Sequence, residues 1–292
     1  GGEMVRWVRA ISHRDGEIPL LNDAALQVAP RPTELVAYAE RLSAGASCCE
    51  ATEAFRPLGP EGDSVWLEAS GYVRGEVPRA VALFDVGPLG PDWIPGHGHA
   101  DTLSFELSID GRRIVTDSGT STYAAGSVRD EERGTAAHNT IVVDGANSSE
   151  VWGGFRVGRR ARVTECDAKW EGGALHVRAT HDGYRRLRPG GVRHTRTWHL
   201  YAGHLQIVDR LEGRGRHDVA VHLHFHPEVT VEASGSAECL LWTTGMRRPA
   251  KLIVAAPLVL RVREGSYSPE FGVRLPSVRA EAVWSGQLPA TF

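Results

Sequence analysis

The sequence predicts a mainly β protein: a large antiparallel β-sandwich preceded by two short α-helices. From about residue 52 onward, short runs of alternating apolar and polar residues recur about every 8–12 residues, separated by Gly, Pro, Asp and Asn. The first 45 residues instead contain two runs with helical spacing. The 292 residues are 41% hydrophobic and 24% charged, which is typical of a globular protein with one large domain or two modest ones.

The first helix is expected over residues 4–12 (MVRWVRAIS), where apolar side chains recur at helical spacing and the following HRDG ends the run. An extended link, residues 17–23 (EIPLLND), follows it. Residues 32–42 (PTELVAYAERL) predict the second helix, with Pro32 or Thr33 at its start. Two helices of this length cannot bury their apolar faces alone. We therefore expect two parts, a helical segment over 1–45 and the β-sandwich over 46–292.

The clearest β element is a hairpin. LSFELSI alternates over residues 103–109, Asp110-Gly111 is a preferred two-residue turn, and RRIVTD returns over 112–117. Other runs that predict strands are SVWLEAS, AVALFDV, NTIVVDG, ARVTECD, ALHVRAT, TRTWHLY, HLQIVDRLEG, VAVHLHFH, CLLWTTG and KLIVAA.

The hairpin brings together residues that can bind a metal. His99 lies just before its first strand, Asp117 lies just after its second, and His138 needs one further loop to reach the same end. Two histidines and an aspartate are a suitable ligand set for a divalent metal, zinc above all, with calcium or manganese as alternatives. Asp101 and Asn139 are candidates to orient these ligands from behind. The alternative is that each residue is an ordinary hydrogen-bonded loop group.

His97 is the candidate for chemistry. In His-x-His on an extended segment, alternate side chains share a face, so His97 should point beside the metal ligand His99. The alternatives for His97 are a third histidine ligand or a loop contact.

An ordered set of motifs resembles the heparinase II/III-like family of polysaccharide lyases. The set consists of H-x-H-x-D at 97–101, SFEL at 104–107, D-x-G at 117–119, R-x-T-A-A-H-N-T at 133–140 and W-G-x-F at 152–155. The resemblance covers roughly residues 1–230 and is densest over 84–160. It implies a helical (α/α) toroid joined to a β-sandwich, with residues 1–45 as the last toroid helices and most of the toroid absent from this sequence.

The resemblance also implies an activity. His99, Asp117 and His138 match the family's metal ligands, and His97 matches a histidine at the catalytic centre. Such enzymes cleave uronic-acid polysaccharides such as heparin, heparan sulfate, alginate or bacterial exopolysaccharide by β-elimination, with a tyrosine and other groups supplied by the toroid. The implied partners are an acidic polysaccharide and the toroid, and the implied location is periplasmic or secreted. A carbohydrate-binding or structural domain without activity, and a metal hydrolase that uses a metal-bound water, remain alternatives.

Weaker site candidates surround these motifs. Tyr123 is a candidate for substrate contact, and a structural tyrosine is an equally reasonable interpretation. Asn22 and Asp23 are also candidates for substrate contact, although helix capping is the favoured role for Asp23. Arg133 is expected to pair with Asp130 or Glu131, and its alternative role is to bind a substrate acid group.

Three further side chains belong to these weaker candidates. Trp152 and Phe155 are expected in the core, with a sugar-stacking platform as the alternative. His222, with two further histidines at 224 and 226, forms a rival metal cluster in VHLHFHP, where a partly buried polar face is the simpler interpretation.

Charge and composition exclude several classes of partner. The net charge of −3 provides no general basic field for nucleic acid, and no apolar run is long enough to span a membrane. Cys48, Cys49, Cys166 and Cys239 indicate neither a disulfide framework nor a cysteine zinc site. The opening GGEMVRWVRAI is typical of the middle of a helix, so we expect the natural N-terminus to lie further upstream.

Overall fold

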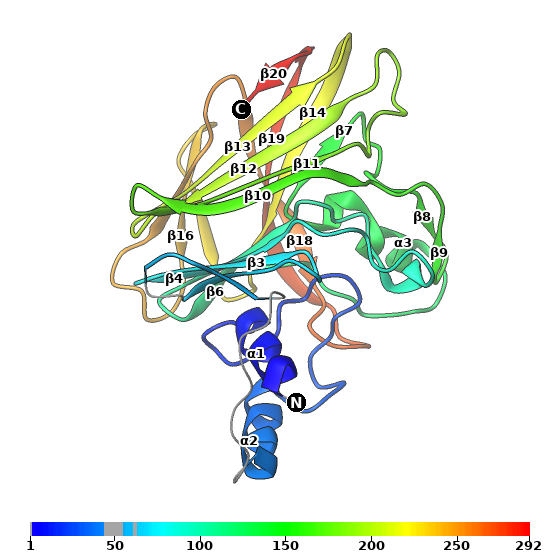
Figure 1. Cartoon of the computed structure of the whole chain (residues 1–292). Coiled ribbons are helices and arrows are strands. Elements are labelled where there is room, and N and C mark those ends of the chain that lie inside the picture. Colours follow the sequence, from blue (N-terminus) through cyan, green and yellow to red (C-terminus); the bar gives the residue numbers. More distant parts are fainter. Residues whose placement is uncertain (1, 44–54, 61–62) are drawn as a thin grey trace.

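A computed structural model describes residues 2–43, 55–60 and 63–292. It confirms the mainly β fold: antiparallel sheets form the body, and two helices project from one end (Figure 1). The predicted boundary at residues 45–46 and the pair Cys48 and Cys49 lie outside the described residues.

The two predicted helices are present. α1 (Gly2–Ile11) and α2 (Pro32–Ser43) begin and end within two residues of the expected bounds. Arg9 joins them through an ion pair of 2.5 Å to Glu40. The described helices include none long and apolar enough to cross a membrane.

Five antiparallel sheets make up the rest of the described chain. A six-stranded meander runs in sequence order: β1 (Arg56–Leu58), β2 (Ser64–Leu67), β3 (Tyr72–Val77), β4 (Ala80–Asp85), β5 (Phe105–Ile109) and β6 (Arg112–Val115). A five-stranded sheet has the order β10 (Val163–Glu171), β11 (Ala174–His181), β12 (Arg193–Leu200), β13 (Leu205–Glu212) and β20 (Ala290–Thr291). A four-stranded sheet has the order β18 (Val259–Tyr267), β19 (Leu275–Gln287), β14 (Arg216–His224) and β7 (Ile141–Val143).

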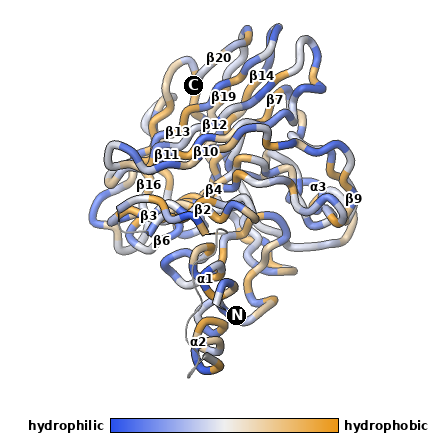
Figure 2. Tube along the Cα trace, viewed as in Figure 1, coloured by the Kyte–Doolittle hydropathy of each residue, from blue (hydrophilic) through white to orange (hydrophobic). Residues whose placement is uncertain are grey.

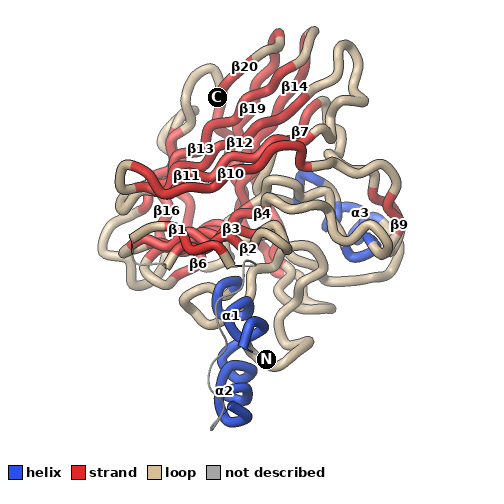
Figure 3. The backbone as a smooth tube through the Cα atoms, viewed as in Figure 1, coloured by secondary structure: helices blue, strands red, loops and turns tan. Residues whose placement is uncertain are grey.

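The remaining elements are short. β15 (Thr230–Ala233), β16 (Glu238–Trp242) and β17 (Ala250–Ile253) form a three-stranded sheet, and β8 (Val151–Trp152) pairs with β9 (Arg156–Val157). The helical turns η1 (Pro95–His97) and η2 (Thr135–Ala137) and the helix α3 (Ser127–Arg133) lie in the loops between strands (Figure 3).

The main core lies between the six-stranded and five-stranded sheets. Hydrophobic residues line the strands of both sheets (Figure 2), and along β4 the side chains from Val81 to Phe84 are all buried, so both faces of that strand are covered. Phe84 of β4 packs on Trp198 of β12 with 5.1 Å between ring centroids, and both side chains are fully buried. The sheets approach so closely at Gly75 that a Cβ there would lie 2.7 Å from the side chains of Leu175 and Leu200.

The predicted hairpin is β5–β6. Its turn residues Asp110 and Gly111 have φ of 52° and 74°, the left-handed conformation that an Asp-Gly turn provides. Buried Glu106 of β5 accepts backbone N–H bonds from Leu20 at 2.8 Å and from Asp117 at 3.1 Å. The carboxylate thus fastens the link after α1 to the open end of the hairpin, where the candidate site lies.

Candidate functional site

The centre of the site is Asp23, at the end of the extended link. Its side chain is 4% exposed, and its two carboxylate oxygens accept hydrogen bonds from four side chains. Oδ2 lies 2.9 Å from His97 Nδ1, and Oδ1 lies 2.8 Å from His99 Nε2. Arg129 of α3 donates to both oxygens, at 2.5 and 2.8 Å, and the Thr120 hydroxyl lies 3.4 Å from Oδ1. Asp23 caps no helix, so the capping prediction is wrong.

These contacts keep Asp23 ionised. Burial works to raise the pKa of this carboxyl, but the hydrogen bonds from His99 and Arg129 outweigh burial and hold the pKa well below its usual range. Burial lowers the pKa of His99 to about 3, so the ring is neutral at physiological pH. The sequence offered only one signal for Asp23, its place in a polar pair that ends an apolar link. It offered none for Arg129.

His97 lies at the surface above this buried carboxylate. Its side chain is 60% exposed, and it belongs to the turn η1 rather than to an extended segment. As predicted, His97 and His99 still lie on one side, because both reach Asp23. The His97 ring centroid is 5.7 Å from that of Tyr123 and 5.4 Å from that of Phe155. The exposed imidazole of His97 therefore lies beside two aromatic rings and bonds to the buried Asp23 carboxylate.

The three predicted metal ligands lie close together. His138 Nδ1 is 2.7 Å from Asp117 Oδ2, and the ring centroids of His99 and His138 are 5.3 Å apart. All three side chains are fully buried at the open end of the β5–β6 hairpin. Burial acts to lower the pKa of His138, but the charge of Asp117 and its hydrogen bond outweigh burial and raise this pKa.

Several buried electron-pair donors here lack a hydrogen-bond partner within the described part of the chain. They are His99 Nδ1, His138 Nε2 and Asp101 Oδ2. Burial raises the pKa of the Asp101 carboxyl to about 6. Unpaired nitrogen and oxygen atoms in a buried space are the donor types that a divalent cation takes, so the residues fit a metal.

The side chains do not, however, form a finished metal centre. Over residues 2–43, 55–60 and 63–292, no three His, Cys, Asp or Glu side chains converge closely enough to count as one. Asp117 bonds to His138, whereas Asp101 keeps an unpartnered oxygen. The bound metal therefore stays a prediction, and Asp101, with its unpartnered Oδ2, is a further candidate ligand.

The side chains of Asn139 and Asn22 bond to backbone groups near the site, and in the described structure neither bonds to a histidine ring. The Asn139 amide donates to the carbonyls of Phe105 and Thr116 at 2.8 and 2.9 Å, which joins the two ends of the hairpin strands. The Asn22 side chain accepts the His99 backbone N–H at 3.1 Å and donates to the Tyr72 hydroxyl at 3.4 Å. Both amides thus fix the chain on which the site histidines sit.

Arg133 corrects one prediction. It is fully buried, and in the described structure it makes no ion pair with Asp130 or Glu131. Its guanidinium instead donates to four backbone carbonyls, including those of Gly96 at 3.3 Å and Gly98 at 2.9 Å. Burial is the main reason that the pKa of Arg133 is lowered. Its place is therefore behind His97, where it fixes the backbone on both sides of that residue.

Trp152 and Phe155 correct another prediction, because neither lies in the core. They are 45% and 47% exposed. Phe155 packs edge-on against Tyr123 with centroids 5.1 Å apart, and Tyr123 in turn contacts Phe271 at 4.6 Å. Half-buried Tyr123 thus joins an aromatic surface beside His97, which favours the sugar-stacking alternative for this group.

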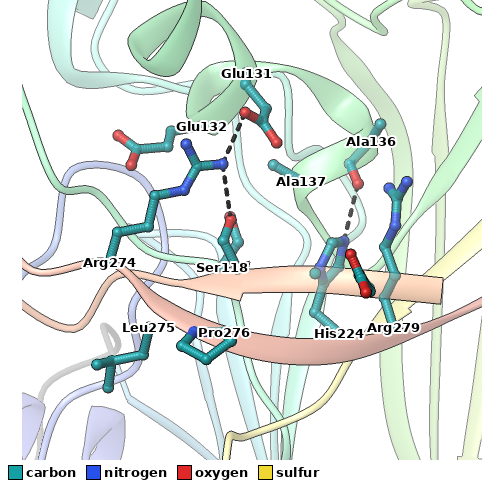
Figure 4. Close-up of a pocket in the computed structure, with 13 residues that line it drawn as sticks. Ser118, Glu131, Glu132, Ala136, Ala137, His224, Arg274, Leu275, Pro276 and Arg279 are labelled. Atoms are coloured by element: carbon teal, nitrogen blue, oxygen red, sulfur yellow. Dashed lines mark hydrogen bonds and ion pairs between the residues drawn. The ribbon is translucent and has the colours of Figure 1, made fainter.

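The rival histidine cluster is a polar face beside a pocket. His222 and His224 of β14 are both buried, with ring centroids 6.4 Å apart, whereas the His226 ring packs on Tyr267. His224 Nε2 donates to the Ala136 carbonyl at 2.9 Å. His224 also lines a cavity of about 420 Å³ between α3 and the β18–β19 hairpin (Figure 4).

Comparison with known families decides the classification. The family model described as heparinase II/III-like, C-terminal, matches residues 59–289. The chain belongs to the heparinase II/III-like family. The comparison with curated protein sequences gives no match.

Solved structures of heparinase-like proteins share the fold. A heparinase III gene product superposes with a TM-score of 0.72 at 18% identity, over 99% of this chain and 44% of that one. The heparan sulfate lyase HepC of Pedobacter heparinus gives 0.71 at 18%, over the same shares, and a further heparinase III gives 0.66 at 15%, over 98% and 46%. The present chain spans less than half the length of these heparinase-like structures.

Proposed function

We propose that this chain supplies the β-sandwich half of the active site of a polysaccharide lyase that cleaves a uronic-acid polymer by β-elimination. Membership of the heparinase II/III-like family supports a lyase, and the similarity to structures of heparan sulfate lyases supports an acidic polysaccharide as substrate. The observation that carries the proposal is His97, an exposed imidazole held by a buried, ionised carboxylate beside the candidate metal residues.

The chemistry explains why such a histidine is useful. Elimination removes the C5 proton next to a carboxylate and expels the oxygen on C4. A charged carboxylate makes that proton poorly acidic, so the enzyme must stabilise the developing enolate-like charge and provide a base. His97 can accept a proton or donate a hydrogen bond at its exposed edge. Tyr123, 5.7 Å away between centroids, lies close enough to contact the same sugar.

The buried donors would hold the metal. His99 and His138, with Asp117 and Asp101, would bind a divalent ion, zinc above all, with calcium or manganese as alternatives. When bound, the ion would supply a fixed positive charge that favours the developing negative charge of the substrate. The protein itself keeps the rings of His99 and His138 buried and orients the His138 ring through its hydrogen bond to Asp117.

The remaining catalytic groups would come from a helical toroid. The matched heparinase-like structures are more than twice as long as this chain, and α1 and α2 project away from the sandwich (Figure 1). In this proposal residues 1–45 are the end of the toroid, and the toroid supplies the tyrosine that completes proton transfer.

A carbohydrate-binding role without catalysis is the second candidate. The exposed aromatic rings of Trp152 and Phe155 favour it, because sugar rings stack on exposed aromatic faces. This role requires no base at His97 and no toroid.

The deciding experiment follows the ultraviolet absorbance of unsaturated uronate. The full-length protein and this chain alone are tested on heparin, heparan sulfate, alginate and hyaluronan. We expect a rise with at least one polymer for the full-length protein, and its loss in His97→Ala. His204→Ala, an exposed histidine at the β12–β13 turn, is the matched control and should retain activity.

Each outcome has a clear meaning. Polymer binding by the full-length protein without any rise on all four polymers would replace the lyase proposal with the binding role. Activity in His97→Ala equal to that of His204→Ala would remove His97 from the chemistry.

A further inference from the structure

We infer that Asp23 is a positioning residue that sets the ring proton of His97 and of His99 at once, so that His97 presents an unprotonated Nε2 at the surface and His99 an unprotonated Nδ1 to the buried donors. The catalytic consequence rests on the proposed lyase function, whereas the proton placement does not.

The geometry around the carboxylate fixes which atoms donate. Arg129 carries only donors, and it donates to both oxygens of Asp23. A carboxylate held in this bidentate way is an acceptor. The ring nitrogens that reach the same two oxygens, His97 Nδ1 at 2.9 Å and His99 Nε2 at 2.8 Å, must therefore carry hydrogen.

Opposite nitrogens of the two rings are thereby left free. A neutral imidazole has one N–H and one lone pair, so His97 keeps its lone pair on Nε2 and His99 on Nδ1. His99 Nδ1 is one of the buried atoms without a partner in the described structure. The His97 side chain is 60% exposed, so its free nitrogen is directed to where a substrate can arrive.

The surrounding contacts leave Asp23 to control the rings. Arg133 fixes the carbonyls on both sides of His97, and Asn22 fixes the backbone N–H of His99. The backbone is therefore held independently of Asp23. What Asp23 adds is the choice of ring tautomer and the angle of each ring, which decide whether His97 can act as a base.

Ring-nitrogen NMR of the histidines tests the inference directly. In the wild-type chain we expect the Nδ1–H tautomer at His97 and the Nε2–H tautomer at His99. Asp23→Asn, whose amide can both donate and accept, should give mixed tautomers at both. Asp144→Asn is the matched control. Asp144 Oδ2 lies 2.7 Å from His217 Nδ1, and this pair is not part of the site, so the substitution should alter the tautomer of His217 alone.

A kinetic measurement accompanies the NMR. If the full-length protein is a lyase, Asp23→Asn should lower kcat about 10–100-fold with little change in KM, as expected for a partner that orients a reacting ring. Asp23→Glu, which keeps the charge, should recover part of this loss. If Asp23→Asn does not fold, the wild-type spectrum and Asp23→Glu carry the test.

The outcomes separate the two proposals. An Nε2–H tautomer at His97 in the wild-type chain, or unchanged tautomers in folded Asp23→Asn, would overturn the inference. The expected tautomers in a full-length protein with no elimination activity would leave it standing and count against the lyase.

Discussion

Arg129 and Asp23 form a two-point contact across 106 residues of sequence, with guanidinium nitrogens 2.5 and 2.8 Å from the two carboxylate oxygens. Both side chains are almost fully buried, at 0% and 4% exposure. The contact joins the link after α1 to α3. It also provides the fixed acceptor on which His97 and His99 are arranged.

Removing Arg129 should cost much more stability than removing an exposed arginine. Arg129→Met leaves Asp23 buried with only the two histidines and the Thr120 hydroxyl as donors, and a broken buried pair costs about 3–5 kcal/mol. Arg79→Met is the control, because the Arg79–Asp110 pair is solvent-exposed and should contribute far less to stability. Urea unfolding measures both, and equal losses would show that the Arg129–Asp23 contact stabilises the fold no more than a surface pair.

Adding a methyl group at Gly75 should destabilise the sandwich. A Cβ there would lie 2.7 Å from Leu175 and Leu200, so the sheets or the leucines must move, at a cost of about 1–3 kcal/mol. Gly203→Ala is the control, since nothing lies within 4 Å of that position and its φ is not positive. If Gly75→Ala and Gly203→Ala were equally stable in urea, the side chains of Leu175 and Leu200 could move aside without cost, which would contradict the prediction.

Metal content should depend on the buried donors and not on the rival histidines. We expect His99→Ala and His138→Ala to lose most of the zinc measured by mass spectrometry after dialysis. His222→Ala should retain it, because His222 lies on β14 and outside this donor set. Retention in His99→Ala with loss in His222→Ala would move the metal site to β14.

Acid should remove stability through Asp209. Burial works to raise the pKa of this carboxyl, but the charge of Arg196 and the hydrogen bonds from His194 and Arg196 hold it well below its usual 3.8. A depressed folded-state pKa stabilises the fold above about pH 4, and this contribution is lost as the pH falls toward the folded-state value. The urea midpoint of the wild-type chain should therefore fall more steeply below pH 4 than that of Asp209→Asn.

The control for Asp209 is Glu68→Gln, an exposed carboxylate 3.7 Å from the Arg56 guanidinium. Its acid slope should match that of the wild-type chain. Parallel slopes for Asp209→Asn and the wild-type chain would show that Asp209 is not the group responsible.

The aromatic surface beside His97 should affect substrate binding more than stability. Phe155→Ala removes an edge-on contact with Tyr123 and a face for a sugar, worth about 0.5–1.5 kcal/mol, so KM or Kd should rise about 2–10-fold. Tyr201→Ala, at the β12–β13 turn, serves as the comparison. Equal affinities of the two variants for the polymer would exclude stacking at Phe155.

The sequence predicted those parts of the site that are fixed by local rules. An Asp-Gly turn between two alternating runs gave the β5–β6 hairpin, and the hairpin gave the proximity of His99 and Asp117. The contacts around Asp23 could not be predicted in this way. They depend on the hydrogen bond from the Leu20 backbone to Glu106, which joins the link to the hairpin across more than 80 residues of sequence.

Two of the wrong predictions, those for Arg133 and for Trp152 and Phe155, have physical reasons. Arg133 was expected to pair with nearby carboxylates, but a buried guanidinium can be satisfied by carbonyls, and neighbouring sequence does not reveal which loop carbonyls will face it. Trp152 and Phe155 were expected in the core because they are large and apolar. The short β8–β9 hairpin lies at the periphery, where such residues stay accessible.

The position of Asp23 shows that the part of the chain matched by the family model does not contain the whole candidate site. The stretch recognised by homology begins at residue 59, whereas the carboxylate that orders both site histidines enters from residue 23. A chain that began at residue 59 would keep His97, His99 and His138. It would lose Asp23, the carboxylate to which the rings of His97 and His99 donate. The part of the chain that the family model matches is therefore smaller than the part that builds the candidate site.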